Sequence, residues 1–216
     1  MSTFGRDDKR GCAILQTIVV QDMAKLTDFM VSRVRAKLIK IFLQSPKEMY
    51  YVRQLTRSSK EEINAVRREL AHMAEKGMVR SEPRGNRLYY QFRDSYPFYP
   101  ELLAIVVKST SLGKQIINNR SKLGFIKFAF LTSKFIRQAK KDTNQVDMVI
   151  VGKVIMPQIA LIVKEYEQEM GTEVNYSCMT EDEFAYRLSR KDPFITNILI
   201  QPRVMLIGDE VNMVNP

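Results

Sequence analysis

The chain has few of the residues that most zinc sites and nucleophilic triads require. Of its 216 residues, one is a histidine, His72, and two are cysteines, Cys12 and Cys178, which lie far apart. These residues match no zinc-ligand spacing, and a single histidine leaves little room for a His-based triad. We therefore expect no zinc site and no histidine-dependent nucleophile.

Long apolar runs are also missing. The longest ones, AILQTIVV at 13–20 and LLAIVV at 102–107, are far shorter than the ~20 residues that cross a bilayer. The first residues are too polar and too acidic for a signal peptide. The sequence thus predicts a cytoplasmic protein with no membrane segment, in which the cysteines stay free thiols.

The net charge of +10 is unevenly distributed. Most of the excess lies in residues 32–95, whereas residues 1–31 are balanced and residues 96–216 add little. A localised basic patch points to a polyanionic partner more than an even excess would. A basic face that is only solvated would have the same composition, so charge alone does not decide.

Helical spacing dominates the first half of this basic third. Apolar residues from Val34 to Phe42 predict a helix over about 30–44, followed by a short extended piece at Met49–Tyr50 and a brief helix around Leu55. The next helix is predicted to open at Ser58–Ser59. It contains the apolar stripe Ile63, Val66, Leu70 and Met73.

Both ends of that third helix have recognisable signals. Ser59 and Glu62 have the spacing of a capping box, in which each side chain satisfies a free backbone N–H. Gly77 suits the left-handed conformation that ends many helices. After it, MVRSEP and RLYYQF predict two strands around a turn at 83–86.

This order of elements is that of a winged helix-turn-helix. The stretch ELAHMAEKGMVRSEPRGNRLYYQF also resembles the corresponding part of ArsR-like and MarR-like bacterial transcriptional regulators. The resemblance covers about residues 32–95 and implies a double-stranded DNA partner for a domain over 30–95. The alternative is a solvated helix and hairpin that happen to be basic.

Side chains on the predicted recognition helix and wing have the chemistry for that partner. Arginine can bind guanine and asparagine can bind adenine in bidentate fashion in the major groove. Wing arginines would reach backbone phosphate or an adjacent minor groove. The residues expected to contact DNA are Lys60, Asn64, Arg67, Arg68, Arg84 and Arg87.

Residues 96–122 are predicted to form a linker helix with an apolar face. Leu102, Leu103, Val106 and Val107 must be buried, either against the second domain or against the same helix of a twin subunit. Because regulators of this kind usually read two half-sites as two-fold dimers, we expect a homodimer. Residues 1–29 are predicted to be a tail with one possible apolar helix.

Residues 123–216 predict strands that alternate with helices. FIKFAFLT, VDMVIVG, EVNYSCM and VMLIG have strand patterns, and helices are expected over 155–171 and from the Thr180 N-cap. The expected fold class is therefore mixed α/β: a winged helix-turn-helix, a linker helix and a C-terminal α/β domain.

The C-terminal domain resembles the minimal nucleotidyltransferase domain that is fused behind a winged helix in some bacterial and archaeal regulators. The resemblance spans about 123–208 and is carried by FAFLTSKFIRQ…VDMVIVG and MTEDEFAYRLSRKDPFITNIL…RVMLIG. In that family a Gly-Ser pair holds nucleotide phosphates and an Asp-x-Asp pair holds two metal ions. The matching positions here are Ser133, Lys134, Arg137, Gln145 and Asp147, with Gly152 as the glycine after the strand.

The departures from the family fall on its chemistry. Gln145 is neutral where Mg²⁺ needs a carboxylate, and Ser133 replaces a glycine that lets backbone approach phosphate. We therefore expect no catalytic residue, no metal and no cofactor, and a domain that serves as a sensor, a dimerisation module or a protein contact. The alternative is a working or nucleotide-binding nucleotidyltransferase, with Mg²⁺ and a nucleotide, that modifies a small molecule, RNA or a protein. A third interpretation keeps the pocket as a site for a small-molecule or nucleotide effector.

Overall fold

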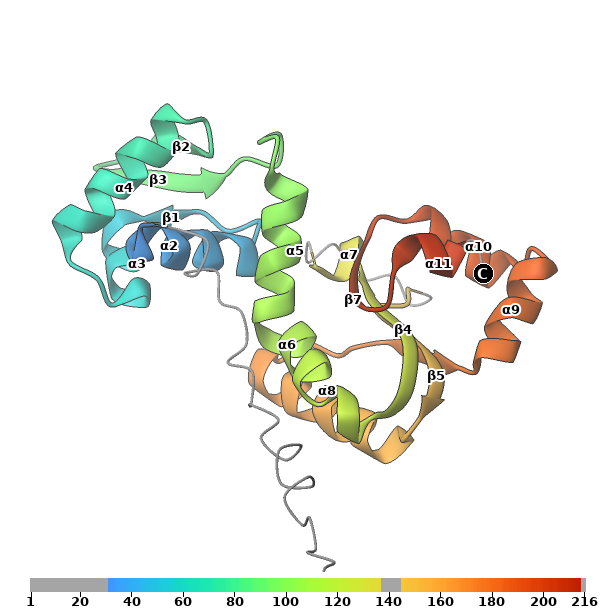
Figure 1. Ribbon diagram of the computed structural model, residues 1–216. Helices are drawn as coiled ribbons and strands as arrows, with labels where there is room; N and C mark the ends of the chain where they lie inside the picture. Colours follow the sequence, from blue (N-terminus) through green and yellow to red (C-terminus); the bar gives the residue numbers. More distant parts are fainter. Residues whose placement is uncertain (1–30, 137–144, 215–216) are drawn as a thin grey trace, which may run out of the picture.

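The computed structural model describes residues 31–136 and 145–214, and over these ranges the protein has a mixed α/β fold with two sheets. A three-stranded sheet with helices α2–α4 lies on one side of helix α5, and a four-stranded sheet lies on the other (Figure 1). No helix in the described ranges combines the length and the apolar character that crossing a membrane requires.

The first sheet and its helices follow the predicted order. The three strands are antiparallel in the order β1-β3-β2, so the β2–β3 hairpin is extended by the short strand before α3. The elements are α2 (Arg33–Gln44), β1 (Tyr50–Tyr51), α3 (Val52–Ser59), α4 (Ile63–Glu75), β2 (Val79–Arg84) and β3 (Arg87–Phe92).

The end of α4 confirms the predicted glycine cap. Gly77 has a φ of 70°, in the left-handed region that glycine adopts without a steric cost. The N–H of Met78 donates to the carbonyl of Met73 at 2.8 Å, and the N–H of Gly77 donates to Ala74 at 3.0 Å. This pair of bonds is the Schellman motif, which satisfies two of the last free carbonyls of the helix.

The start of α4 differs from the prediction. Ser59 is the last residue of α3, and its hydroxyl donates to the carbonyl of Thr56 instead of capping α4. The N-cap is Glu62, whose carboxylate accepts from the N–H of Asn64 at 2.7 Å and of Ala65 at 3.1 Å. The predicted capping box is therefore wrong, because one carboxylate alone satisfies two free N–H groups at this end.

The predicted linker helix is two helices, α5 (Tyr99–Ser109) and α6 (Ser111–Asn118), followed by the short 3-10 turn η1 (Arg120–Lys122). The helix is interrupted at Thr110, which is extended, and Ser111 has a φ of 51°. The face of α5 that contains Leu103 and Val106 is buried and packs between α2 and β7. The apolar face of this helix is thus covered within the chain.

The four-stranded sheet has the order β6-β5-β4-β7. Strand β6 is parallel to β5, to which helix α8 (Met156–Met170) connects it, whereas β4 is antiparallel to both of its neighbours. Only β5-α8-β6 is therefore a parallel βαβ unit. The strands are β4 (Gly124–Thr132), β5 (Met148–Val154), β6 (Tyr176–Met179) and β7 (Arg203–Ile207).

Helices cover both faces of this sheet. Met148 and Ile150 belong to the core shared with α5, α6 and α8, while Val149 and Val151 pack with a second cluster on the opposite face. The helices of that second cluster are α9 (Glu181–Ser189), α10 (Pro193–Ile200) and α11 (Glu210–Val214), and the short α7 (Ser133–Ile136) follows β4. The first core continues through α5 to α2, so it joins the two sheets.

Candidate nucleic-acid interface

Helix α4 has one buried and one exposed face. Val66, Leu70 and Met73 are fully buried against the helices of the first sheet, as the 3.6-residue periodicity predicts. Asn64, Arg67, Arg68 and Ala71 are exposed. Within the described residues, no hydrogen bond or ion pair holds either arginine side chain. The exposed face therefore presents an amide and two unpaired guanidinium groups to an incoming ligand.

Lys60 does not lie on α4, contrary to the prediction. It has a φ of 54° and occupies the left-handed position that ends α3, three residues before α4 begins. Its side chain is exposed in the turn between the two helices. The cause of the error is the shifted helix start, since the turn takes up residues that the sequence pattern assigned to the first helical turn.

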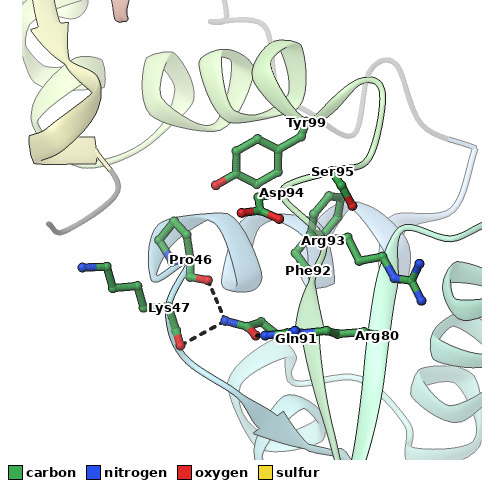
Figure 2. Close-up of a pocket in the computed structure, with 9 residues that line it drawn as sticks. All are labelled: Pro46, Lys47, Arg80, Gln91, Phe92, Arg93, Asp94, Ser95 and Tyr99. Carbon is green, nitrogen blue, oxygen red and sulfur yellow. Dashed lines mark hydrogen bonds between the residues drawn. The ribbon is translucent and has the colours of Figure 1, made fainter. Parts of the chain in front are cut away.

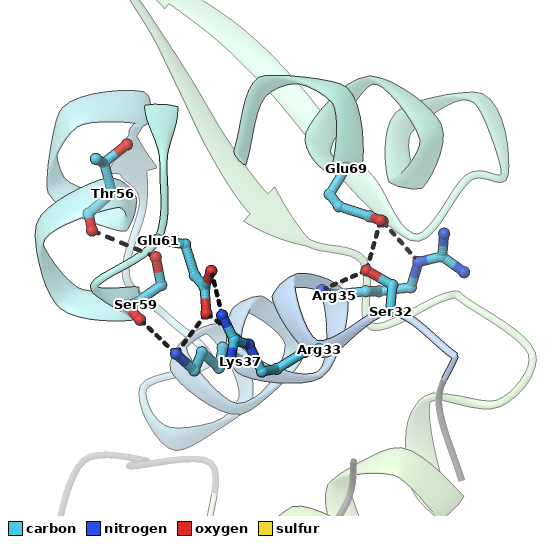
Figure 3. A network of polar contacts seen from close by, with 8 residues as sticks. All are labelled: Ser32, Arg33, Arg35, Lys37, Thr56, Ser59, Glu61 and Glu69. Atoms are coloured by element: carbon cyan, nitrogen blue, oxygen red, sulfur yellow. Dashed lines mark hydrogen bonds and ion pairs between the residues drawn. The ribbon is translucent and has the colours of Figure 1, made fainter. Parts of the chain in front are cut away.

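A polar network fixes α4 and the turn before it against α2 (Figure 3). Glu61, in the turn, pairs with Lys37 and Arg33 of α2, and Lys37 also donates to the carbonyl of Ser59 at 3.0 Å. These contacts anchor the turn from one side. The ammonium group of Lys37 lowers the pKa of Glu61, and Arg33 adds to the effect.

A second part of the network holds the middle of α4. The Glu69 carboxylate accepts from the hydroxyl of Ser32 at 2.6 Å and from Nε of Arg35 at 2.8 Å. Partial burial acts to raise the pKa of Glu69, but these two hydrogen bonds outweigh it and the pKa is lowered. Ser32 also caps α2 by accepting from the N–H of Arg35. Glu69 thus links α4 to the N-terminus of α2.

The hairpin arginines are exposed, but aromatic rings orient them. The Arg84 guanidinium lies 5.6 Å from the ring centre of Tyr89 and pairs with Glu82 at 2.9 Å. The Arg87 guanidinium lies 4.7 Å from the ring centre of Tyr51. Cation–π contacts of this length hold a guanidinium without using up its hydrogen-bond donors. Arg84 also donates from a terminal nitrogen to Sδ of Met49 at 3.0 Å, whereas no hydrogen bond within the described residues engages the Arg87 guanidinium, so Arg87 keeps its donors for a phosphate.

Sequence reasoning missed the two tyrosines that hold these arginines. Tyr51 and Tyr89 are paired across β1 and β3, with ring centroids 5.6 Å apart. Their chain positions are far apart, and only the strand register brings them together. Arg53 and Arg57 on α3 are also exposed and add positive charge to this part of the surface.

Gln145 and Asp147, which match the metal-binding pair of the nucleotidyltransferase family, belong to a small hydrogen-bond cluster. Asp147 lies directly before β5 rather than within it, and only 1% of its surface is exposed. Its Oδ1 accepts from Nε2 of Gln145 at 3.2 Å, and its Oδ2 accepts from the N–H of Asn175 at 2.9 Å. The carboxylate therefore connects the start of β5 to the segment before β6, and Gln145 covers it.

The other residues of the predicted pocket are placed only in part. Ser133 and Lys134 begin α7 at the end of β4, but their side chains are outside the described part of the structure, as is all of Arg137. Among residues 31–136 and 145–214, no three His, Cys, Asp or Glu side chains gather as a metal site would require. Gly152 lies inside β5 rather than after it.

A small cavity lies among α2, the junction of α5 and α6, the end of β4, α7 and α8, and neither Gln145 nor Asp147 lines it. It has a volume of about 80 Å³ and is lined largely by apolar side chains, including Leu131, Ile136 and Tyr166. Pockets for small molecules typically measure ~300–1,000 Å³. The cavity is therefore too small for a nucleotide in this conformation.

Comparisons of the chain with protein-family models, with curated proteins and with solved structures return no match. The function is therefore inferred from the geometry of the chain itself. It offers an exposed basic helix face beside a basic hairpin, and a buried carboxylate whose two oxygens each accept an internal hydrogen bond.

Proposed function

We propose that the protein is a sequence-specific DNA-binding transcriptional regulator. Residues 30–95 would act as a winged helix-turn-helix, with α4 in the major groove and the β2–β3 hairpin against backbone phosphate or the minor groove. The observation that carries the proposal is the exposed face of α4, where Asn64, Arg67 and Arg68 project beside one another from a helix clamped to α2.

Three features support this function over a solvated basic surface. The order of helices and strands matches the one that the resemblance implies. The arginines on α4 have no internal partners among the described residues, and those on the hairpin are oriented by tyrosines. Preoriented side chains lose less conformational freedom when they bind.

The C-terminal domain would be a nucleotidyltransferase-like domain without activity, serving as a sensor, a dimerisation module or a protein contact. The closed Gln145–Asp147 cluster supports a structural role for Asp147. We also propose a homodimer, because a two-fold protein reads two half-sites. Since the apolar face of α5 is already covered by α2 and β7, the dimer contact would use another surface.

The test is fluorescence anisotropy of the full chain on duplex DNA, including the region upstream of its own gene, across a range of salt concentrations. We expect tight, salt-sensitive binding that prefers the upstream duplex. The double variant Arg67→Ala, Arg68→Ala should bind at least about tenfold more weakly, with a flatter dependence on salt.

The matched control is Lys153→Ala, Lys164→Ala, which removes the same charge from exposed positions of β5 and α8. It should retain both the affinity and the salt dependence. Equal losses in the two double variants would mean that net charge, and not the α4 face, governs binding. Unchanged binding in the α4 variant would overturn the assignment of that helix.

A further inference from the structure

A hollow of about 650 Å³ lies at the base of the β2–β3 hairpin, between the loop after α2 and the start of α5 (Figure 2). Its volume falls within the range of pockets that hold small molecules, ~300–1,000 Å³. The titratable residues that line it are three cations, Lys47, Arg80 and Arg93, one acid, Asp94, and Tyr99. This lining favours an anionic occupant.

The floor of the hollow is held in place by hydrogen bonds. Oε1 of Gln91 accepts from Nε of Arg80 at 3.1 Å and from a terminal nitrogen at 2.6 Å. The amide nitrogen of Gln91 donates to the carbonyls of Pro46 and Lys47 at 3.2 and 3.1 Å. Gln91 thus fixes the guanidinium of Arg80 while leaving other N–H donors of that group unused.

Two further cations, Lys47 and Arg93, line the hollow. Lys47 and Arg93 lie on opposite sides of Gln91 and Asp94 in Figure 2. Within the described residues, no hydrogen bond or ion pair engages the Arg93 guanidinium, and no cation lies within ion-pairing distance of Asp94. The Arg80 guanidinium held by Gln91 and the Arg93 guanidinium together suit an oxyanion with more than one negative charge.

This site is separate from the proposed DNA contacts. The Arg80–Gln91 pair lies four residue pairs from the Arg84–Arg87 pair at the hairpin tip, which is about 13 Å along the strands. A duplex that touches the tip therefore does not have to cover the hollow. The hollow also includes the first residue of α5, Tyr99, so an occupant would touch the hairpin and the helix that leads to the second sheet.

We propose that this hollow is a binding site for a small, free oxyanion with at least two negative charges, such as a phosphate ester or a polycarboxylate. Arg80 would be the fixed contact, and Arg93 would donate to the anion from the rim. The proposal does not depend on the proposed function, because it requires no DNA. The other source of the same chemistry is a backbone phosphate of bound duplex.

The experiment is calorimetric titration of the full chain with pyrophosphate, with ionic strength held constant by sodium chloride. We expect saturable binding with a Kd of about 1 mM or below, weakened about tenfold by Arg80→Gln and by Arg93→Gln. The Arg93 side chain makes no hydrogen bond within the described residues, so the Arg93→Gln variant should fold as the parent does. Lys40→Gln, an equal change of charge at an exposed position of α2, should leave the Kd unchanged.

The double variant Arg67→Ala, Arg68→Ala separates the two sources. If it binds pyrophosphate as the parent does, the hollow is a site of its own, and this result stands even if the protein binds no DNA. If its pyrophosphate affinity falls as much as that of the hollow variants, the anion binds the α4 face and the proposal is wrong. Absence of binding above the chloride baseline, or equal loss in Lys40→Gln, would also overturn it.

Discussion

The amide of Gln145 contributes to the way Asp147 is held at the start of β5. Gln145 can donate to Asp147, whereas a second carboxylate at that position could only repel it or share a proton with it. The amide is therefore part of the hydrogen-bond cluster that closes the site. The amide at position 145 supplies a donor to the buried acid at position 147.

Placing a glutamate at position 145 should destabilise the protein. In Gln145→Glu, two carboxylates would face each other where Nε2 and Oδ1 are now 3.2 Å apart, in a site almost closed to water. We expect a loss of about 1–3 kcal/mol in the free energy of unfolding at pH 7, which shrinks at acidic pH as the pair takes up one proton. Thermal unfolding at several pH values measures it.

Added Mg²⁺ makes this variant a test of the pocket as well. We expect the melting temperature of both the parent and Gln145→Glu to stay unchanged by the ion. The control Gln168→Glu, at an exposed position of α8, should unfold close to the parent. A melting temperature of Gln145→Glu that rises with Mg²⁺ would show that the two acids still form a metal site, in favour of the enzyme alternative.

At the scale of elements, Gly152 shows why β4 and β5 can pair closely. It has a φ of 145°, and a Cβ there would lie 2.2 Å from the carbonyl oxygen of Phe125, where the register of the two strands shifts. Gly152→Ala should therefore lower the free energy of unfolding by about 3 kcal/mol or more. Gly171→Ala, at an open left-handed position, should cost only about 1–2 kcal/mol. Equal costs in urea unfolding would contradict this explanation.

Local signals in the sequence predicted elements better than they predicted pairings. Gly77 and the Thr180 cap act on their own neighbours, and both are found where they were expected. Helix α10 (Pro193–Ile200) was missed because PFITNILI has no polar face that would reveal a period. The antiparallel pairing of β4 with β5 was missed because register depends on contacts between distant residues.

In the candidate site, too, local patterns predicted residue positions better than contacts between distant residues. Asn64, Arg67 and Arg68 share a helix face, so periodicity alone places them together. Lys60 was misplaced because Glu62 caps α4 by itself and moves the helix start. The Tyr51–Tyr89 pair depends on strand register, and the Gln145–Asp147–Asn175 cluster depends on β6 lying beside β5. None of these contacts leaves a periodic signal.

The hydrogen bonds of Glu69 with Ser32 and Arg35, which link α4 to α2, should make the stability of the protein depend on pH in a defined direction. The folded pKa of Glu69 is lowered, so its contribution is fully present above its ordinary pKa of 4.5 and is lost as the pH falls through the lowered value. Glu69→Gln should cost about 1.5–3 kcal/mol at pH 7, and this difference should shrink below about pH 4.5.

Glu75→Gln is the matched control for Glu69→Gln, since Glu75 lies on the same helix but is exposed and, among the described residues, forms an ion pair only with the adjacent Lys76. It should change the free energy of unfolding little at any pH. Urea unfolding of the three proteins from pH 3 to 7 gives the comparison. A Glu69→Gln deficit that stays constant down to pH 3 would mean that the loss is one of packing and not of charge.

At the scale of the whole molecule, α5 makes the two sheets parts of one core. One apolar cluster runs from Leu38 and Phe42 of α2 through Leu103 and Val106 of α5 to Leu206 of β7. A connection buried in this way differs from an exposed linker, across which few contacts pass. The second sheet is therefore packed, through α5, against the helix that supports α4.

This continuity predicts that the chain unfolds in one cooperative transition. Leu103 is 4% exposed and contributes to the core shared by both sheets, so Leu103→Ala should cost about 2–5 kcal/mol. Because the core is shared, the loss should appear equally in both parts. In the parent, amides of α2 and of α8 should lose their protection from hydrogen exchange at the same urea concentration. In the variant they should again lose it together, at a lower urea concentration. Calorimetric and van't Hoff enthalpies should also agree. Two separate transitions, with Leu103→Ala moving only one of them, would mean that the sheets fold as independent units and that α5 belongs to just one.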